Sequence, residues 1–139
     1  MAGLRLGMAF AEAFVVEQLN KIKPPYNINS LTQSTAMDIL NKVELFTENL
    51  KILKSEKQKL SHALTELKVV IKVHESEANF LLVQVDDANE IYDYLIGLGI
   101  VVRNRSNQVG CENCLRFTVG RPNENIKLIK ALSLFNKSV

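Results

Sequence analysis

Cys114-Leu115-Arg116-Phe117-Thr118-Val119-Gly120 is the stretch that decides the fold of this chain. Its apolar residues alternate with Arg116 and Thr118, which predicts a short β-strand with one apolar face and one polar face. A guanidinium held on such a stiff element is suited to bidentate binding of a carboxylate or a phosphate. A lone arginine on a strand is more commonly a solvated charge on an edge strand, so other segments must decide between the two roles.

The composition of the 139-residue chain is that of one globular domain with a sizeable core. Hydrophobic residues make up 47% of the sequence and charged residues 23%, which is ordinary for a soluble protein. The net charge is only +2 and the basic residues are dispersed, so no nucleic-acid partner is indicated. No apolar run approaches the length of a membrane span, so we expect no membrane association.

Cys111 and Cys114 form the only Cys-x-x-Cys pair of the sequence. A zinc site needs further ligands, and the spacing of His62 and His74 does not supply them, so no metal site is predicted. The pair runs into a predicted strand, whereas a thioredoxin-type pair precedes a helix. We therefore expect two reduced thiols, with Cys114 half-buried.

The N-terminal region predicts a strand, a helix and a connector. Residues 4–10 are mainly apolar and predict a short buried strand, and helical spacing follows over residues 11–23 until Pro24-Pro25 stops it. Arg5 and the apolar run after it resemble a short signal peptide, but an acidic residue interrupts the run at once. We therefore expect a cytoplasmic chain in which residues 26–29 form a connector.

A long helical segment follows this connector. Ser30 and Gln33 have the spacing of a capping box, in which each side chain satisfies a free amide of the first turn. Behind them runs an apolar stripe with a charged opposite face, which predicts an amphipathic segment with a break near Asn41-Lys42. We expect it to pack on a sheet rather than in a coiled coil. The stripe consists of Leu40, Val43, Phe46, Leu50, Leu53, Leu60, Leu64 and Leu67.

The second half of the chain alternates strands and helices. Large and β-branched apolar residues indicate the strands, and helical spacing, an Asp86 or Asp87 cap and a Gly99 stop indicate the helices. This order predicts an α/β fold, an α+β two-layer sandwich in which helices, one of them long, cover one face of a small, mostly antiparallel sheet. The expected strands are residues 69–73, 79–85, 100–103 and 114–119, and the expected helices are residues 87–98 and 122–135.

Four segments of the sequence occur in a specific combination. They are Ala2-Gly3-Leu4-Arg5-Leu6-Gly7, Lys23-Pro24-Pro25-Tyr26-Asn27-Ile28-Asn29-Ser30-Leu31, Ser76-x-Ala78-Asn79-Phe80, and Gly99-Ile100-Val101-Val102-Arg103 followed by the opening stretch. In this order and at these separations they resemble the C-terminal part of the fold-type I, pyridoxal-phosphate-dependent aminotransferases of class I and II. Within that family they resemble the histidinol-phosphate aminotransferases. The resemblance covers the whole chain, which corresponds to the C-terminal small domain of a typical member.

The resemblance implies a cofactor, pyridoxal phosphate, and roles for individual residues. Arg5 matches the arginine that binds the cofactor phosphate. Arg116 matches the arginine that binds the acidic end of the substrate, and Arg103 matches a second arginine used where that end is a phosphate, because two guanidiniums suit a dianion better than a monoanion. Asn79 matches a position near the substrate channel. Arg105 is expected to be a solvated loop charge.

The sequence also departs from the family. The Schiff-base lysine would lie before Met1, so no catalytic residue is assigned and the chain alone is expected to be inactive. Residues 1–29 are expected to be a remnant of the large domain plus the connector, residues 30–139 the small domain, and the parent enzyme a homodimer. Arg121 replaces the hydroxyl residue usual before the last helix, which removes a side-chain cap.

Three functional hypotheses stay open. The first is a C-terminal fragment of a histidinol-phosphate aminotransferase, whose complete form transfers an amino group between glutamate and imidazole-acetol phosphate. Fragments of a related aminotransferase or of a threonine-phosphate decarboxylase belong to the same class. The second is a non-catalytic module that binds anions through its arginines, and the third is a structural domain that associates through the long helix. The coding sequence upstream of Met1 would distinguish the first from the others.

Overall fold

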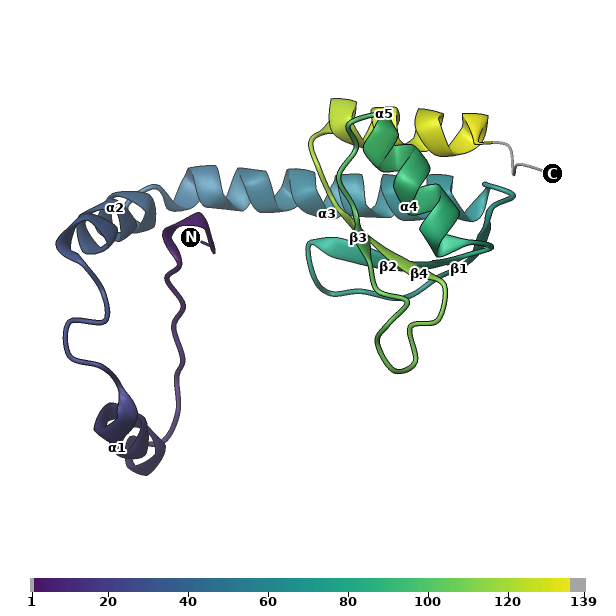
Figure 1. The fold of residues 1–139 in the computed structure, drawn as a ribbon. Coiled ribbons are helices and arrows are strands. Elements are labelled where there is room, and N and C mark those ends of the chain that lie inside the picture. The colour runs from purple at the N-terminus through teal and green to yellow at the C-terminus, as the bar shows by residue number, and fades with distance from the viewer. Residues whose placement is uncertain (1, 136–139) are drawn as a thin grey trace. The chain divides into compact units, whose positions relative to one another are not determined.

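The computed structural model describes residues 2–135 and contains two compact units, residues 1–48 and 49–139 (Figure 1). The helical segments are η1 (Ala2–Leu4), α1 (Ala13–Ile22), α2 (Ser30–Leu40), α3 (Val43–Thr65), α4 (Ala88–Gly97) and α5 (Pro122–Leu134). The strands are β1 (Val70–Val73), β2 (Phe80–Val85), β3 (Arg103–Asn104) and β4 (Cys114–Thr118). The predicted α/β fold is confirmed. No helix in the described part of the chain has the length and apolar character to cross a bilayer.

The sheet of the second unit is antiparallel throughout, with strand order β1-β2-β4-β3. Three of its strands lie close to their predicted positions. The predicted strand over residues 100–103 is wrong, because only Arg103 and Asn104 pair with β4. The chain before them is still leaving α4, and the backbone N–H of Ile100 donates to the carbonyl of Leu95 at 2.8 Å.

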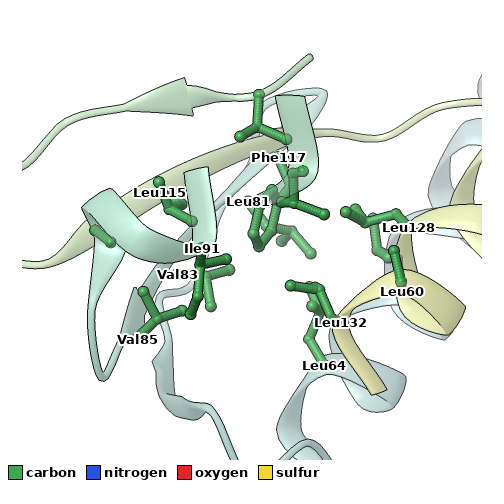
Figure 2. Close-up of a cluster of buried hydrophobic side chains, with 14 of the residues drawn as sticks. Leu60, Leu64, Leu81, Val83, Val85, Ile91, Leu115, Phe117, Leu128 and Leu132 are labelled. Atoms are coloured by element: carbon green, nitrogen blue, oxygen red, sulfur yellow. The ribbon is translucent and has the colours of Figure 1, made fainter. Parts of the chain in front are cut away.

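One face of the sheet is covered by α4, α5 and the C-terminal part of α3 (Figure 1). Alternate residues of β2 and β4 point to that face and are buried, as the period of two along a strand requires. The strands and the helices thus share one hydrophobic core, seen in Figure 2. Its labelled members are Leu60, Leu64, Leu81, Val83, Val85, Ile91, Leu115, Phe117, Leu128 and Leu132.

The predicted packing of the long helix on the sheet is confirmed for its C-terminal part. Leu60 and Leu64 of α3 are buried in the core, and Leu53 and Leu67 pack against it. The earlier part of the apolar stripe differs, since Phe46 is 61% exposed. The predicted break at Asn41-Lys42 is confirmed, because α2 ends at Leu40 and α3 begins at Val43.

The N-terminal strand predicted over residues 4–10 is wrong for this chain. Residues 2–4 form the 3-10 turn η1, Arg5 has a positive φ of 55°, and no regular element follows until α1. A strand exists only when a neighbour accepts its backbone hydrogen bonds. Among the described residues no other strand pairs with this segment, because the sheet consists of β1 to β4 alone.

The helix ends correct the predicted capping of α2. Asn29, not Ser30, is the cap, and its Oδ1 accepts a hydrogen bond from the backbone N–H of Thr32 at 2.8 Å. Gln33 Nε2 donates to the carbonyl of Ile28 at 3.0 Å instead of closing a capping box with Ser30. Asn and Ser are equally good caps, so the sequence did not distinguish the two neighbouring positions.

The ends of α4 confirm the predicted stop and one of the two predicted caps. Asp87 Oδ1 accepts from the backbone N–H groups of Asn89 and Glu90, each at 3.0 Å. Gly99 ends the helix with a φ of +72°, a conformation that residues with a Cβ rarely adopt. At α5, Arg121 provides no side-chain cap, as expected, but Glu124 Oε2 accepts from the backbone N–H of Arg121 at 2.7 Å.

A buried hydrogen-bond network joins α3, α5 and the end of β4. Asn125 Oδ1 accepts from the backbone N–H of Gly120 at 2.9 Å, and Asn125 Nδ2 donates to the carbonyl of Gly120 at 3.2 Å and to Glu56 Oε2 at 3.0 Å. Hydrogen bonds from Lys59 and then Asn125 lower the pKa of the Glu56 carboxyl. A side chain at Gly120 would require Glu124 to move, since an added Cβ would lie 2.7 Å from Glu124 Oε2.

We expect Asn125→Ala to lower the free energy of unfolding by about 1–3 kcal/mol, because both backbone groups of Gly120 lose their partner and Glu56 loses a donor. The matched control is Asn123→Ala, which removes an exposed amide from the same helical turn and should change stability by less than about 0.5 kcal/mol. Urea denaturation followed by circular dichroism measures both. Equal losses for the two variants would contradict this role of Asn125.

Candidate anion-binding site

Two arginines meet on the polar face of the sheet. Arg103 of β3 and Arg116 of β4 are directly opposite one another in the antiparallel register. Residues opposite each other in a sheet project from the same face, with Cβ atoms about 4.5–5.5 Å apart. Because Leu115 and Phe117 point into the core (Figure 2), both guanidiniums lie on the face away from the helices.

Arg116 has no partner of opposite charge among the described residues. Its guanidinium carbon lies 4.8 Å from the centre of the Phe80 ring, a cation–π contact across neighbouring strands. Its Nε is buried and has no hydrogen-bond acceptor within the described part of the chain. Burial first, and then the charges of Arg103 and Arg105, lower the pKa of the Arg116 guanidinium. A buried donor without an acceptor is rare in proteins and is suited to an anionic ligand.

Arg105 is half-buried, which differs from the expected solvated loop charge. Together with Arg103 it borders a hollow of about 560 Å³ at the β3 edge of the sheet. The side of this hollow formed by α4 is lined by Asn89, Tyr92 and Asp93. Among the described residues, no ion pair is found between a carboxylate and Arg103, Arg105 or Arg116. The site therefore concentrates positive charge without a direct ion pair.

Of the expected site residues, the structure brings Arg103 and Arg116 together. Asn79 is exposed at the start of β2, and its carbonyl accepts from the backbone N–H of Val119 at 2.9 Å. Arg5 is exposed and belongs to the first unit. The roles of Arg5, Asn79, Arg103 and Arg116 stay predictions.

Phe80 is a member of the site that the sequence analysis did not single out. Its position is set by Ser76, whose Oγ donates to the carbonyl of Phe80 at 2.6 Å and accepts from the backbone N–H of Ala78 at 3.1 Å. Lys57 of α3 donates to the carbonyl of Ser76 and holds this turn from the helix side. Phe80 belongs to the segment from Ser76 to Phe80 that the sequence already marked. Its contact with the guanidinium of Arg116 depends on the β2–β4 register, which the sequence does not reveal.

The two cysteines are free thiols, as expected. Cys114 is 2% exposed, so it is more deeply buried than the predicted half-buried thiol. Burial, followed by the proximity of Cys111 and Glu112, raises the pKa of the Cys114 thiol. Within residues 2–135 no group of three or more His, Cys, Asp or Glu side chains is placed to hold a metal ion.

Comparison with known proteins decides the family. The family model described as aminotransferase class I and II matches residues 1–132. The chain belongs to this family. Two similar aminotransferases are the histidinol-phosphate aminotransferase of Flavobacterium johnsoniae, 47% identical over 98% of the chain, and that of Bacteroides fragilis, 50% identical over 96% of it. The chain spans 39% of the length of each of these relatives.

Solved structures of two aminotransferases and of a decarboxylase share the fold. The histidinol-phosphate aminotransferase from Clostridium acetobutylicum superposes with a TM-score of 0.79 at 24% identity, over 86% of this chain and 37% of that one. The L-threonine-O-3-phosphate decarboxylase from Porphyromonas gingivalis reaches 0.74 at 28% identity, over 88% of this chain and 38% of that one. The histidinol-phosphate aminotransferase from Sinorhizobium meliloti, solved in complex with pyridoxal-5'-phosphate, reaches 0.73 at 16% identity, over 86% of this chain and 33% of that one.

Proposed function

We propose that this chain is the C-terminal part of a histidinol-phosphate aminotransferase, and that its arginine pair binds the phosphate of the substrate. The complete enzyme would transfer an amino group between glutamate and imidazole-acetol phosphate. The names of relatives 47–50% identical to the chain support the activity. The observation that carries the substrate class is the cross-strand pair of Arg103 and Arg116 without a described carboxylate partner.

The chemistry of the pair favours a phosphate over a carboxylate. A phosphate monoester carries about −1.5 to −2 charges near pH 7 and has three strong acceptor oxygens. Two planar guanidiniums on rigid strands supply a matching number of donors in fixed positions. A single carboxylate would leave one guanidinium uncompensated, beside a like charge, on a partly buried surface.

The proposed cofactor is pyridoxal phosphate, which supplies an electron sink for the transfer of the amino group when it is bound. Among the described residues, Arg5 is the group matched to it. Its guanidinium is exposed and forms no ion pair with a described carboxylate, so it is free to bind a phosphate. We further propose that residues 1–29 belong with the large domain, residues 30–139 form the small domain, and the complete enzyme is a cytoplasmic homodimer.

The alternative function is that of a threonine-phosphate decarboxylase. It is supported by the structural similarity of the chain to such an enzyme, with which it shares 28% of its residues over the matched region. Both activities use a substrate with a phosphate at one end, so the arginine pair fits either. Product analysis distinguishes them: decarboxylation releases carbon dioxide from the amino acid, whereas transamination releases none and requires a second amino or keto acid.

We expect Arg103→Gln in the complete enzyme to lower kcat/KM for histidinol phosphate by about tenfold or more, since one charge-assisted hydrogen bond contributes roughly 1.5–3 kcal/mol. The loss for an unphosphorylated amino acid should be much smaller. Arg121→Gln, which removes an exposed arginine at the start of α5, is the control for the change in net charge. Equal losses for the phosphorylated and unphosphorylated substrates would show that Arg103 does not bind the phosphate.

A further inference from the structure

Arg105 is a third arginine at the proposed phosphate site, and the strand register places it there. Asn104 is opposite Leu115, and the backbone N–H of Arg105 donates to the carbonyl of Cys114 at 2.8 Å, so the pairing of β3 with β4 continues one residue beyond the strand. Side chains alternate along an extended chain. Arg105 therefore projects from the same face as Arg103, two residues earlier, whereas Asn104 projects to the helix side.

Contacts on the helix side confirm this alternation. Asn104 Nδ2 donates to Asn89 Oδ1 of α4 at 2.7 Å, and Asn104 Oδ1 accepts from the backbone N–H of Ser106 at 2.9 Å. The residues before and after Arg105 are thus held by side-chain and backbone hydrogen bonds. Arg105 is half-buried on an anchored segment, which is unlike a charge on a freely solvated loop.

Arg105 also acts electrostatically on the pair. Its charge lowers the pKa of Arg116, as the charge of Arg103 does, so its guanidinium lies near enough to repel that of Arg116. It borders, with Arg103, the hollow at the β3 edge of the sheet, whose lining does not include Arg116. Asp93, which also lines this hollow, forms no ion pair with either arginine. Guanidiniums that lie near one another without a direct ion pair are stabilised by an anion of high charge.

We propose that Arg105 completes an arginine triad with Arg103 and Arg116, which binds the phosphate of a phosphate monoester and discriminates it against a carboxylate. This inference rests on the proposed function, in which the pair is the phosphate site. A dianion neutralises most of the charge of the triad, whereas a carboxylate leaves about two positive charges uncompensated. The third arginine thus adds to affinity for phosphate and adds little to affinity for carboxylates.

Titration of the 139-residue chain with inorganic phosphate and with acetate tests the triad. Arginine Nε–Hε resonances report binding residue by residue, so a second phosphate at Arg5 does not obscure the readout. We expect phosphate to shift the Arg116 resonance, and Arg105→Gln to raise the Kd of phosphate measured there about tenfold. The Kd of acetate should change less than twofold. Arg121→Gln, with the same change in net charge, should leave both values unchanged.

The outcomes separate the triad from the proposed function. If Arg105→Gln and Arg121→Gln bind phosphate equally while the Arg103 resonance of Arg116→Gln does not respond to phosphate, the triad is wrong and the pair stands. If Arg105→Gln weakens phosphate and acetate by the same factor, the discrimination is wrong. If phosphate leaves the Arg116 resonance of the unsubstituted chain unshifted, both the triad and the phosphate site fail.

Discussion

Leu132→Ala is expected to lower the free energy of unfolding of the chain by about 2–5 kcal/mol. Leu132 lies on α5, is 1% exposed, and packs with residues of the sheet and of α3 in the core (Figure 2). The substitution removes buried apolar contacts and leaves a cavity that rigid neighbours on three elements do not fill. Since a domain of this size is stabilised by about 5–15 kcal/mol in total, the loss is a large part of its stability.

The same substitution two residues later is the matched control. Leu134 is on the same helix but is 63% exposed, so Leu134→Ala should change the free energy of unfolding by less than about 0.5 kcal/mol. Urea denaturation followed by circular dichroism gives both values, and equal m-values would show that the same amount of surface unfolds. A loss at Leu134 as large as that at Leu132 would mean that α5 faces the core differently.

Arg116→Gln is expected to have the largest effect on activity. In the complete enzyme it should lower kcat/KM for the phosphorylated substrate by at least about a hundredfold, or about 2.7 kcal/mol of transition-state binding. The reason is that a bidentate guanidinium and its charge are both lost from the centre of the proposed site. Glutamine retains a hydrogen-bond donor and much of the side-chain length, so the loss reports the charge and the fork geometry.

The stability of this variant distinguishes a binding role from a structural one. Burial and the charges of Arg103 and Arg105 already disfavour the ionised Arg116, and its stabilising contact is the cation–π contact with Phe80, worth about 0.5–1 kcal/mol. Arg116→Gln should therefore change the free energy of unfolding by less than about 1 kcal/mol. If it unfolds the chain instead, or if Arg116→Lys retains full activity, the arginine does not act as a bidentate anion receptor.

Local patterns determined most of the fold of the second unit. The alternation in the opening stretch, the cap at Asp87 and the stop at Gly99 lead to the observed β4 and α4, because each depends on residues that are neighbours in sequence. The family was also visible in the sequence, and the arginines that match its substrate site were named from it. The predicted cap at Ser30 was wrong, because the neighbouring Asn29 is an equally good cap and takes this position.

Pairing and proximity were decided by tertiary structure alone. The segment after residue 4 has the apolar pattern of a strand, but it forms none here because a strand needs a neighbour, and neighbours come from other parts of a fold. The register of β3 on β4 places Arg103 opposite Arg116 and carries Arg105 to the same face. Charge repulsion and ring stacking act through space over a few ångströms, so residues far apart in the chain combine into a site only when the sheet has set their distance.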